Sequence, residues 1–189
     1  MRLTDVTVPS GVTAIEDSVF TYCRALTRVT LPSSVTSIGE CAFYGCESLA
    51  SVTLPTGVTY IGSGAFYRCE SLTDVALPKG VTAVKKETFA WCSRLTSVAM
   101  QDGVTSIGYG AFARCSRLKS VTIPDGVTAI GNCAFYGCEA LESIAIPHGV
   151  STVEADTFTE CTSLASVTIP KGVKVARKAF EGSVKIKRV

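Results

Sequence analysis

The sequence predicts an α/β repeat solenoid made of eight repeats of 23 residues. Proline recurs at intervals of 23 or 46 residues, and phenylalanine, valine and leucine each keep a register of the same length. A repeat of this size cannot bury its apolar side alone, so neighbouring repeats must stack. The registers are Pro9, Pro32, Pro55, Pro78, Pro124, Pro147 and Pro170; Phe20, Phe43, Phe66, Phe89, Phe112, Phe135, Phe158 and, one residue early, Phe180; Val12 to Val173; and Leu3 to Leu164.

The first part of each repeat alternates apolar and polar side chains. In the sixth repeat Val121 and Ile123 alternate with Ser120 and Thr122, which is typical of a half-buried strand. The proline ends the strand, and the glycine two residues later favours a turn. Residues 127–130 are expected to form a second short extended piece.

The last part of each repeat carries the phenylalanine and a cysteine three residues later, as in Phe135 and Cys138. This spacing predicts one helical turn with both side chains facing inward. With strands ~4.8 Å apart, eight stacked repeats make a slab on the order of 40 Å long. The repeats account for the whole chain, so we expect one domain, residues 1–189, with no linker.

Two cysteines five residues apart occur twice, as Cys41 and Cys46 and as Cys133 and Cys138. The second member of each pair belongs to the cysteine register, whereas the first sits where other repeats have serine, glycine, glutamate or aspartate. A metal site needs further ligands, and the chain's one histidine, His148, falls at another repeat position. We therefore expect no metal or redox site and free, mostly buried thiols. Cys41 and Cys133 are expected to be the most exposed.

Composition excludes several function classes. A net charge of +2 gives no basic field of the kind that nucleic-acid binding needs. No apolar run approaches the ~20 residues of a membrane span. His148 has no catalytic partner at fixed spacing, and the glycines are repeat turns, not a phosphate-binding loop. We expect no enzyme activity, no catalytic residues and no cofactor. No signal peptide is visible at the start of the chain.

The repeat reads L-x-x-V-x-L-P followed by V-x-x-I-G-x-x-A-F-x-x-C, and it resembles the BspA-like subclass of leucine-rich repeats over about residues 3–187. Where ordinary leucine-rich repeats carry asparagine after the strand, this chain has mostly glycine. The resemblance implies a right-handed solenoid with a parallel β-sheet on the concave face and short strands and one-turn helices elsewhere. It also implies a surface protein of bacteria or protists that binds extracellular matrix or other cells, which favours a cell-surface or secreted location.

The two ends of the array differ in charge. Seven lysines and arginines fall between residues 171 and 188, against one acid, Glu181. A polar outer face stops end-to-end stacking, so the irregular last repeat is expected to act as a C-terminal cap. A basic patch for polyanions or an anionic membrane surface is the alternative. The first repeat has no such device, which indicates edge-to-edge self-association or a fragment of a longer array.

Two surfaces are candidates for partner binding. The strand face is small and polar with one anchor, an arginine, whereas the segment around phenylalanine and cysteine is rich in aromatic residues and arginines, as interfaces are. Its tyrosines could instead pack over neighbouring turns, leaving only the hydroxyl in water. The candidate binding residues are Trp91, Arg94, Arg114, Arg117, Tyr67 and Tyr136 in this segment and Arg28 on the strand face.

These observations predict a non-enzymatic interaction or adhesion module that binds a matrix protein, a cell-surface protein or a glycan through the solenoid surface. The alternative is a structural spacer, or a self-assembling or engineered scaffold, with no dedicated ligand. Gln101 replaces the proline that otherwise ends the strand. Because repeat stability depends on coupling between neighbours, we expect a weak junction there, around residues 100–104.

Overall fold

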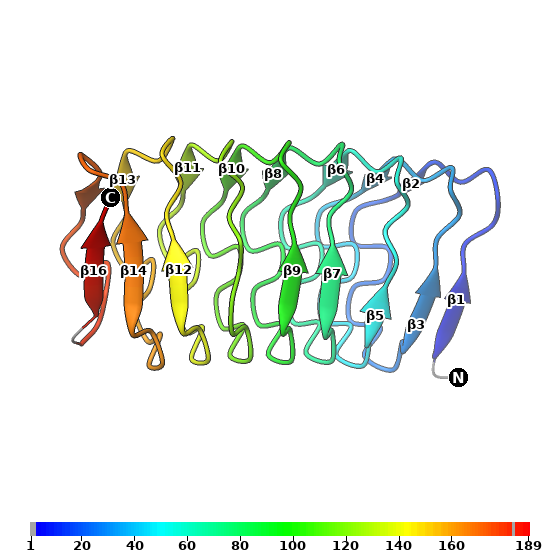
Figure 1. Cartoon of the computed structure of the whole chain (residues 1–189). Helices are drawn as coiled ribbons and strands as arrows, with labels where there is room; N and C mark the ends of the chain where they lie inside the picture. The colour runs from blue at the N-terminus through cyan, green and yellow to red at the C-terminus, as the bar shows by residue number, and fades with distance from the viewer. Residues whose placement is uncertain (1–2, 183) are drawn as a thin grey trace.

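A computed structural model describes residues 3–182 and 184–189 of the chain, which form a nearly straight row of stacked turns (Figure 1). The two ends of the chain lie at opposite ends of the row. Most turns supply a front strand, a second strand behind it and a turn segment that contains the phenylalanine. Parallel pairing between successive turns confirms the predicted solenoid of about eight repeats.

The strands fall into two sets. The front strands are β1 (Asp5–Thr7), β3 (Arg28–Thr30), β5 (Ser51–Val52), β7 (Asp74–Ala76), β9 (Ser97–Ala99), β12 (Ser143–Ala145), β14 (Ser166–Ile169) and β16 (Lys185–Arg188). The second strands are β2 (Ala14–Ile15), β4 (Ser37–Ile38), β6 (Tyr60–Ile61), β8 (Ala83–Val84), β10 (Ser106–Ile107), β11 (Ala129–Ile130), β13 (Thr152–Val153) and β15 (Lys174–Val175).

The front strands alternate as the sequence predicts. In β3 the side chain of Val29 is buried, whereas Arg28 and Thr30 on either side of it are exposed. Successive strands pair one repeat apart, so Arg28 lies opposite Ser51. A front strand such as β3 therefore gives its middle, apolar side chain to the core and its two flanking side chains to the front face.

The predicted helical turn is wrong: the residues that the structure describes contain no helix, so the α/β class is corrected to a β-solenoid. In the turn segment Cys41 and Gly45 have φ of 52° and 70°, and left-handed residues interrupt a right-handed helix. The amides of Cys41, Phe43 and Gly45 donate to carbonyls of the next turn at 2.9, 2.8 and 2.7 Å. The amides between them close four-residue β-turns within their own repeat, as from Tyr44 to Cys41 at 3.0 Å. Hydrogen bonds therefore link the turn segments of successive repeats into a ladder. We call the surface formed by these phenylalanine-containing segments the turn face.

The phenylalanines form a continuous stack behind the turn face. Their ring centroids are 5.2–5.7 Å apart from Phe20 to Phe180, within the range that favours offset stacking. Each ring from Phe43 to Phe158 is almost fully buried. The stack fixes the spacing of the turns, and so it fixes the spacing of the side chains on the outer side of the same segments.

The two sheets are interrupted at the same two places. Front-strand pairing stops between β5 and β7, and second-strand pairing stops between β6 and β8. Pairing stops again before β12 and β13, and the residues equivalent to a front strand at 120–122 are not in a strand. The ladder of the turn face continues past both places, with Phe66 N to Thr88 O at 2.9 Å. The turns are therefore held together there mainly by the turn face and the phenylalanine stack.

The junction between the turn that contains Gln101 and the next turn is paired in one sheet and unpaired in the other. Within the described part of the chain, no backbone hydrogen bond joins residues 96–101 to residues 119–124 on the front face. The second sheet continues across this junction, with Thr128 N donating to Thr105 O at 2.9 Å.

Candidate functional site

A row of tyrosines on the turn face is broken by two alanines. The same repeat position holds Tyr44, Tyr67, Ala90, Ala113 and Tyr136. The rings of Tyr44 and Tyr67 stack with centroids 4.6 Å apart and an interplanar angle of 6°. The methyl groups of the two alanines leave the next two ring positions empty. The row resumes at Tyr136.

This break is a cavity of about 350 Å³. Its walls are the two tyrosines that flank the break, and its rim carries Trp91 and Tyr109, whose side chains are 44% and 49% exposed. The lining residues are Tyr67, Glu87, Ala90, Trp91, Tyr109, Gly110, Ala113, Arg114, Cys133 and Tyr136. The cavity combines several aromatic side chains with one carboxylate and one guanidinium, which is a composition suited to binding.

Arg114 is held between two aromatic rings. Its guanidinium carbon lies 4.7 Å from the ring centre of Tyr136 and 5.6 Å from that of Trp91, both within cation–π range. Its Nη1 lies 2.6 Å from Oε2 of Glu160, and its Nη2 donates to the Tyr136 hydroxyl at 3.2 Å. Tyr136 in turn donates to Glu160. The charge of Arg114 is therefore matched within the protein.

The same contacts shift the ionisation of these groups. The hydrogen bond to Glu160, followed by burial, raises the pKa of Tyr136. The hydrogen bond from Tyr136 and the charge of Arg114 lower the pKa of Glu160 despite some desolvation. On the opposite wall, burial and the nearby Glu87 carboxylate raise the pKa of Tyr67. The tyrosines stay neutral near pH 7, and Glu160 is ionised.

Residues with left-handed backbone conformations on the turn face point their side chains towards the next turn. Glu87 and Arg114 have φ of 53° and 63°, and each side chain lies over a glycine of the next turn. A Cβ on Gly110 would stand 3.3 Å from Cγ of Glu87, and one on Gly137 would stand 2.8 Å from Cδ of Arg114. The glycines make room for these side chains.

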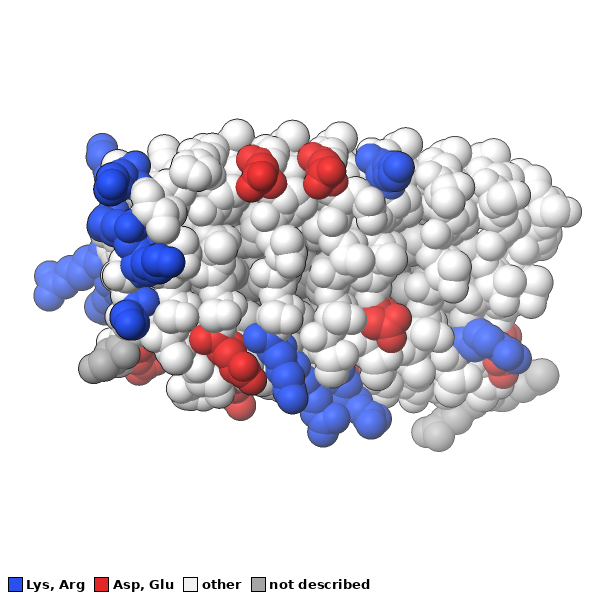
Figure 2. All heavy atoms as spheres, in the orientation of Figure 1, with Lys and Arg blue, Asp and Glu red and all other residues white. Residues whose placement is uncertain are grey.

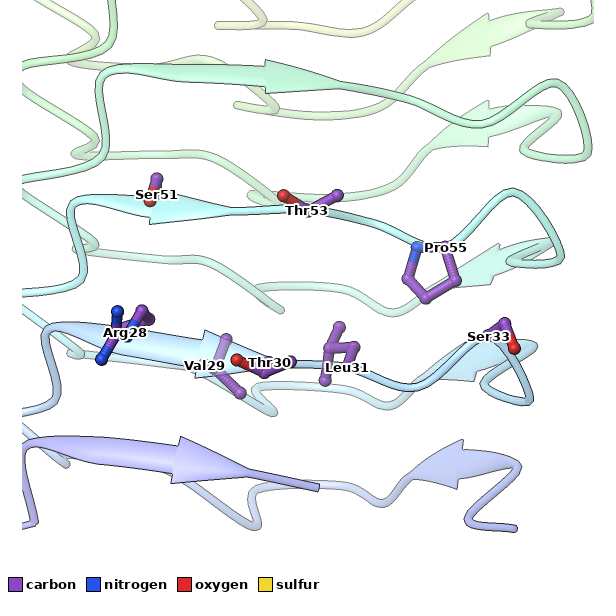
Figure 3. A pocket seen from close by; sticks show the side chains of 8 residues that line it. All are labelled: Arg28, Val29, Thr30, Leu31, Ser33, Ser51, Thr53 and Pro55. Atoms are coloured by element: carbon purple, nitrogen blue, oxygen red, sulfur yellow. The ribbon is translucent and has the colours of Figure 1, made fainter. Parts of the chain in front are cut away.

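A second hollow lies on the front face around Arg28 (Figure 3). It has a volume of about 390 Å³ and is lined by small or aliphatic residues of β3 and β5 and the turns that follow them. Arg28 pairs with Asp5 at 3.1 Å, and its side chain is 74% exposed. Figure 2 shows few charged side chains over the middle of this face. The hollow therefore offers one exposed arginine, which is already paired with Asp5, and no aromatic ring.

The structure gathers four of the seven candidate residues. Tyr67, Trp91, Arg114 and Tyr136 line the turn-face cavity, whereas Arg94 and Arg117 are exposed but do not line it, and Arg28 lies on the front face. Sequence reasoning missed Glu87, Tyr109 and the two alanines. The alanines share the tyrosine register, so the break was visible as a pattern. Glu87 and Tyr109 come from other registers and give no such signal.

The cysteines are free thiols, and most of them are buried. All nine are free, and across residues 3–182 and 184–189 no group of three metal-ligating side chains gathers. Six thiols of the cysteine register are buried, and each donates to the phenylalanine carbonyl of the preceding turn, as Cys92 does to Phe66 at 3.2 Å. Cys41 and Cys133 are half-exposed, as expected, and so is Cys23. The described residues also include no helix long and apolar enough to cross a membrane.

The sequence matches the family described as BspA type leucine rich repeat region, in six copies, over residues 1–93 and 82–189. No curated protein matches the chain.

Solved structures of bacterial leucine-rich repeat proteins are similar to the whole chain. A leucine rich cell surface protein from Faecalibacterium prausnitzii A2-165 is 31% identical over 98% of the chain, with a TM-score of 0.62. A leucine-rich repeat protein from Bacteroides ovatus is 26% identical over the full chain, with a TM-score of 0.62. One from T. pallidum is 27% identical over 96% of it, with a TM-score of 0.59, and 79% of that protein is covered. The chain spans 60% and 66% of the first two proteins.

Proposed function

The chain belongs to the BspA-type leucine-rich repeat family, and from this premise we propose that it is a non-enzymatic adhesion or recognition module. Its partner is a matrix protein, a cell-surface protein or a glycan. The name of the similar Faecalibacterium protein supports a place at the cell surface.

The turn-face cavity is the observation that carries this proposal. Aromatic and arginine side chains dominate binding energy at interfaces, and Trp91, Tyr109 and Arg114 stand together there around an open hollow. The front face offers small polar side chains and a single arginine. We therefore place the main binding surface on the turn face.

The C-terminal end serves as the cap of the single domain, residues 1–189. Strand β16 pairs with the outer edge of β14, and its four residues are exposed. Figure 2 shows basic side chains gathered over this end of the row. The exposed basic residues of the last repeat include Lys171, Lys174, Lys185, Lys187 and Arg188. Their repulsion opposes the addition of another chain to β16.

The test is a binding screen of the purified chain at physiological salt against immobilised fibronectin, fibrinogen and a glycan array. We expect a saturable signal that falls at least tenfold with Trp91→Ala and is unchanged with Arg28→Ala. Thermal unfolding of both variants shows whether the fold is kept. No signal at micromolar concentrations, or loss with Arg28→Ala alone, contradicts the proposal.

A second candidate function is assembly through the first turn. The outer edge of β1 pairs with no described strand, and Leu3 and Val19 of the same first turn are 45% and 52% exposed. An open strand edge with apolar neighbours favours addition of another chain. Light scattering would then show a mass that rises with concentration and returns to one chain with Val6→Lys.

A further inference from the structure

We propose that the turn-face cavity binds the guanidinium group of an arginine side chain on the partner, stacked on Tyr67 and paired with Glu87. The inference rests on the proposed function and names the chemistry that the binding surface recognises. The inference follows from the shape of the space beside Ala90, which we call the gap, and from the unpaired charge of Glu87. It also follows from the stacking and the ion pair that Arg114 makes beside the gap.

The shape of the gap calls for a planar group. One face of the Tyr67 ring is covered by Tyr44 at 4.6 Å, and the other turns towards the space left by Ala90. The turns repeat at the 5.5 Å spacing of the Phe66 and Phe89 rings. A flat group stacked on Tyr67 would therefore occupy the place of the missing ring without moving the backbone.

The charge of the gap calls for a cation. Arg114 is matched by Glu160, whereas Glu87, which also lines the cavity, makes no ion pair with any described residue. The nearest basic neighbour in sequence, Lys86, has its ammonium 5.7 Å from the Tyr109 ring centre and does not line the cavity. A neutral ring entering the gap would strip water from the Glu87 carboxylate and give nothing in return.

The protein's own Arg114 makes the contacts that we propose for the arginine of a partner. Its guanidinium stacks on Tyr136 at 4.7 Å and pairs with a carboxylate at 2.6 Å. Tyr67 and Glu87 offer an incoming guanidinium the same two contacts from the other wall of the cavity. Guanidinium is flat, stacks on aromatic faces and binds carboxylates through two parallel hydrogen bonds, whereas an ammonium is a strongly hydrated point charge.

The chain carries its own reporter for this site. Trp91 is the one tryptophan of the sequence and stands on the rim of the cavity. The probes are N-acetyl-arginine methylamide and its citrulline counterpart, which has the same shape without the charge. Lysine and tyrosine analogues complete the set, and each is titrated while Trp91 fluorescence is recorded.

We expect saturable binding of the arginine probe in the millimolar range, at least tenfold weaker binding of the citrulline probe, and weaker binding of lysine and tyrosine. Glu87→Gln and Ala90→Tyr should each weaken the arginine probe at least tenfold. Ala90→Tyr extends the row in which Tyr44 and Tyr67 already stack at successive turns, so the fold should accept it. Glu139→Gln, an exposed acid outside the cavity, is the matched control and should change nothing.

Equal binding of arginine and citrulline, preference for the tyrosine probe, or no effect of Glu87→Gln overturns the inference. The screen could also find a partner whose binding depends on Trp91 but not on any arginine of its own. That result would support the proposed function and reject the inference that the cavity binds a guanidinium group. If neither the screen nor the probes give a signal, both fail.

Discussion

The guanidinium carbon of Arg114 lies 4.7 Å from the centre of the Tyr136 ring, and both side chains bind Glu160. Because the folded protein lowers the pKa of Glu160 below its ordinary 4.5, the stabilisation from this cluster is fully present above that pH. It is lost as the pH falls through the lowered pKa. Protonated Glu160 releases Arg114, whose guanidinium carbon is 5.6 Å from the Trp91 ring centre. Trp91 fluorescence should therefore change below pH 4.5, and Glu160→Gln should abolish that step. An identical step in the variant contradicts this assignment.

Close contact between turns makes some glycines irreplaceable. A Cβ on Gly62 would stand 2.5 Å from the backbone nitrogen of Glu40, whereas a Cβ on Gly57 would meet nothing nearer than 3.7 Å. Gly62→Ala should cost roughly 2–3 kcal/mol of unfolding free energy, or more, because two backbones must separate. Gly57→Ala should stay within about 0.5 kcal/mol of the original chain. Urea unfolding of the two variants measures this, and equal stabilities would rule the contact out.

The cysteines should differ in reactivity by burial. Burial raises the pKa of Cys46 and of Cys161 to about 12, and Cys46 is closed off by its neighbours. Native protein should therefore react with a thiol reagent at Cys23, Cys41 and Cys133 and at the other six only after unfolding. Burial and nearby acids also raise the pKa of Cys41, so its reaction should be slow at pH 7 and faster as the pH rises. Mass spectrometry of the labelled peptides identifies the sites, and rapid labelling of Cys92 would contradict the packing.

The interruptions of the two sheets should appear in amide exchange. The amides of Thr59 and Thr105 donate to the preceding turn at 2.9 and 2.8 Å, whereas the equivalent amide of Thr82 donates to no backbone carbonyl among the described residues. Thr82 should exchange faster than the other two. The same experiment tests the weak junction predicted at residues 100–104. If the amides of residues 100–104 are as protected from exchange as those of neighbouring turns, the prediction that Gln101 weakens this junction is wrong.

Much of the fold could be predicted from the sequence because packing in a solenoid repeats with the sequence. Phe43 and Phe66 share a register and therefore stack, and Val29 is buried because its strand alternates. The helical turn could not be excluded, since the left-handed backbone of Trp91 or Arg114 leaves no mark in residue type. Glycine, which favours that conformation, fills only some of these positions.

The binding cavity was less predictable. Trp91 and Arg114 were candidates by composition, and their register already placed them one turn apart. The hollow beside them depends on what is missing, the ring at Ala90, and on Glu87 reaching across from another register. Side-chain direction, not spacing alone, brings these groups together.

The most direct test of a binding surface on the turn face compares two variants. One adds a tyrosine ring to the turn face, and the other adds a tyrosine ring to the front face. Ala90→Tyr fills the cavity beside Tyr67, and Ser120→Tyr adds an equal ring at an exposed position of the front face. Surface plasmon resonance of a partner found in the screen would compare both variants with the original chain. The account predicts at least tenfold weaker binding for Ala90→Tyr and unchanged binding for Ser120→Tyr. The reverse result would place the binding surface on the front face and contradict the account.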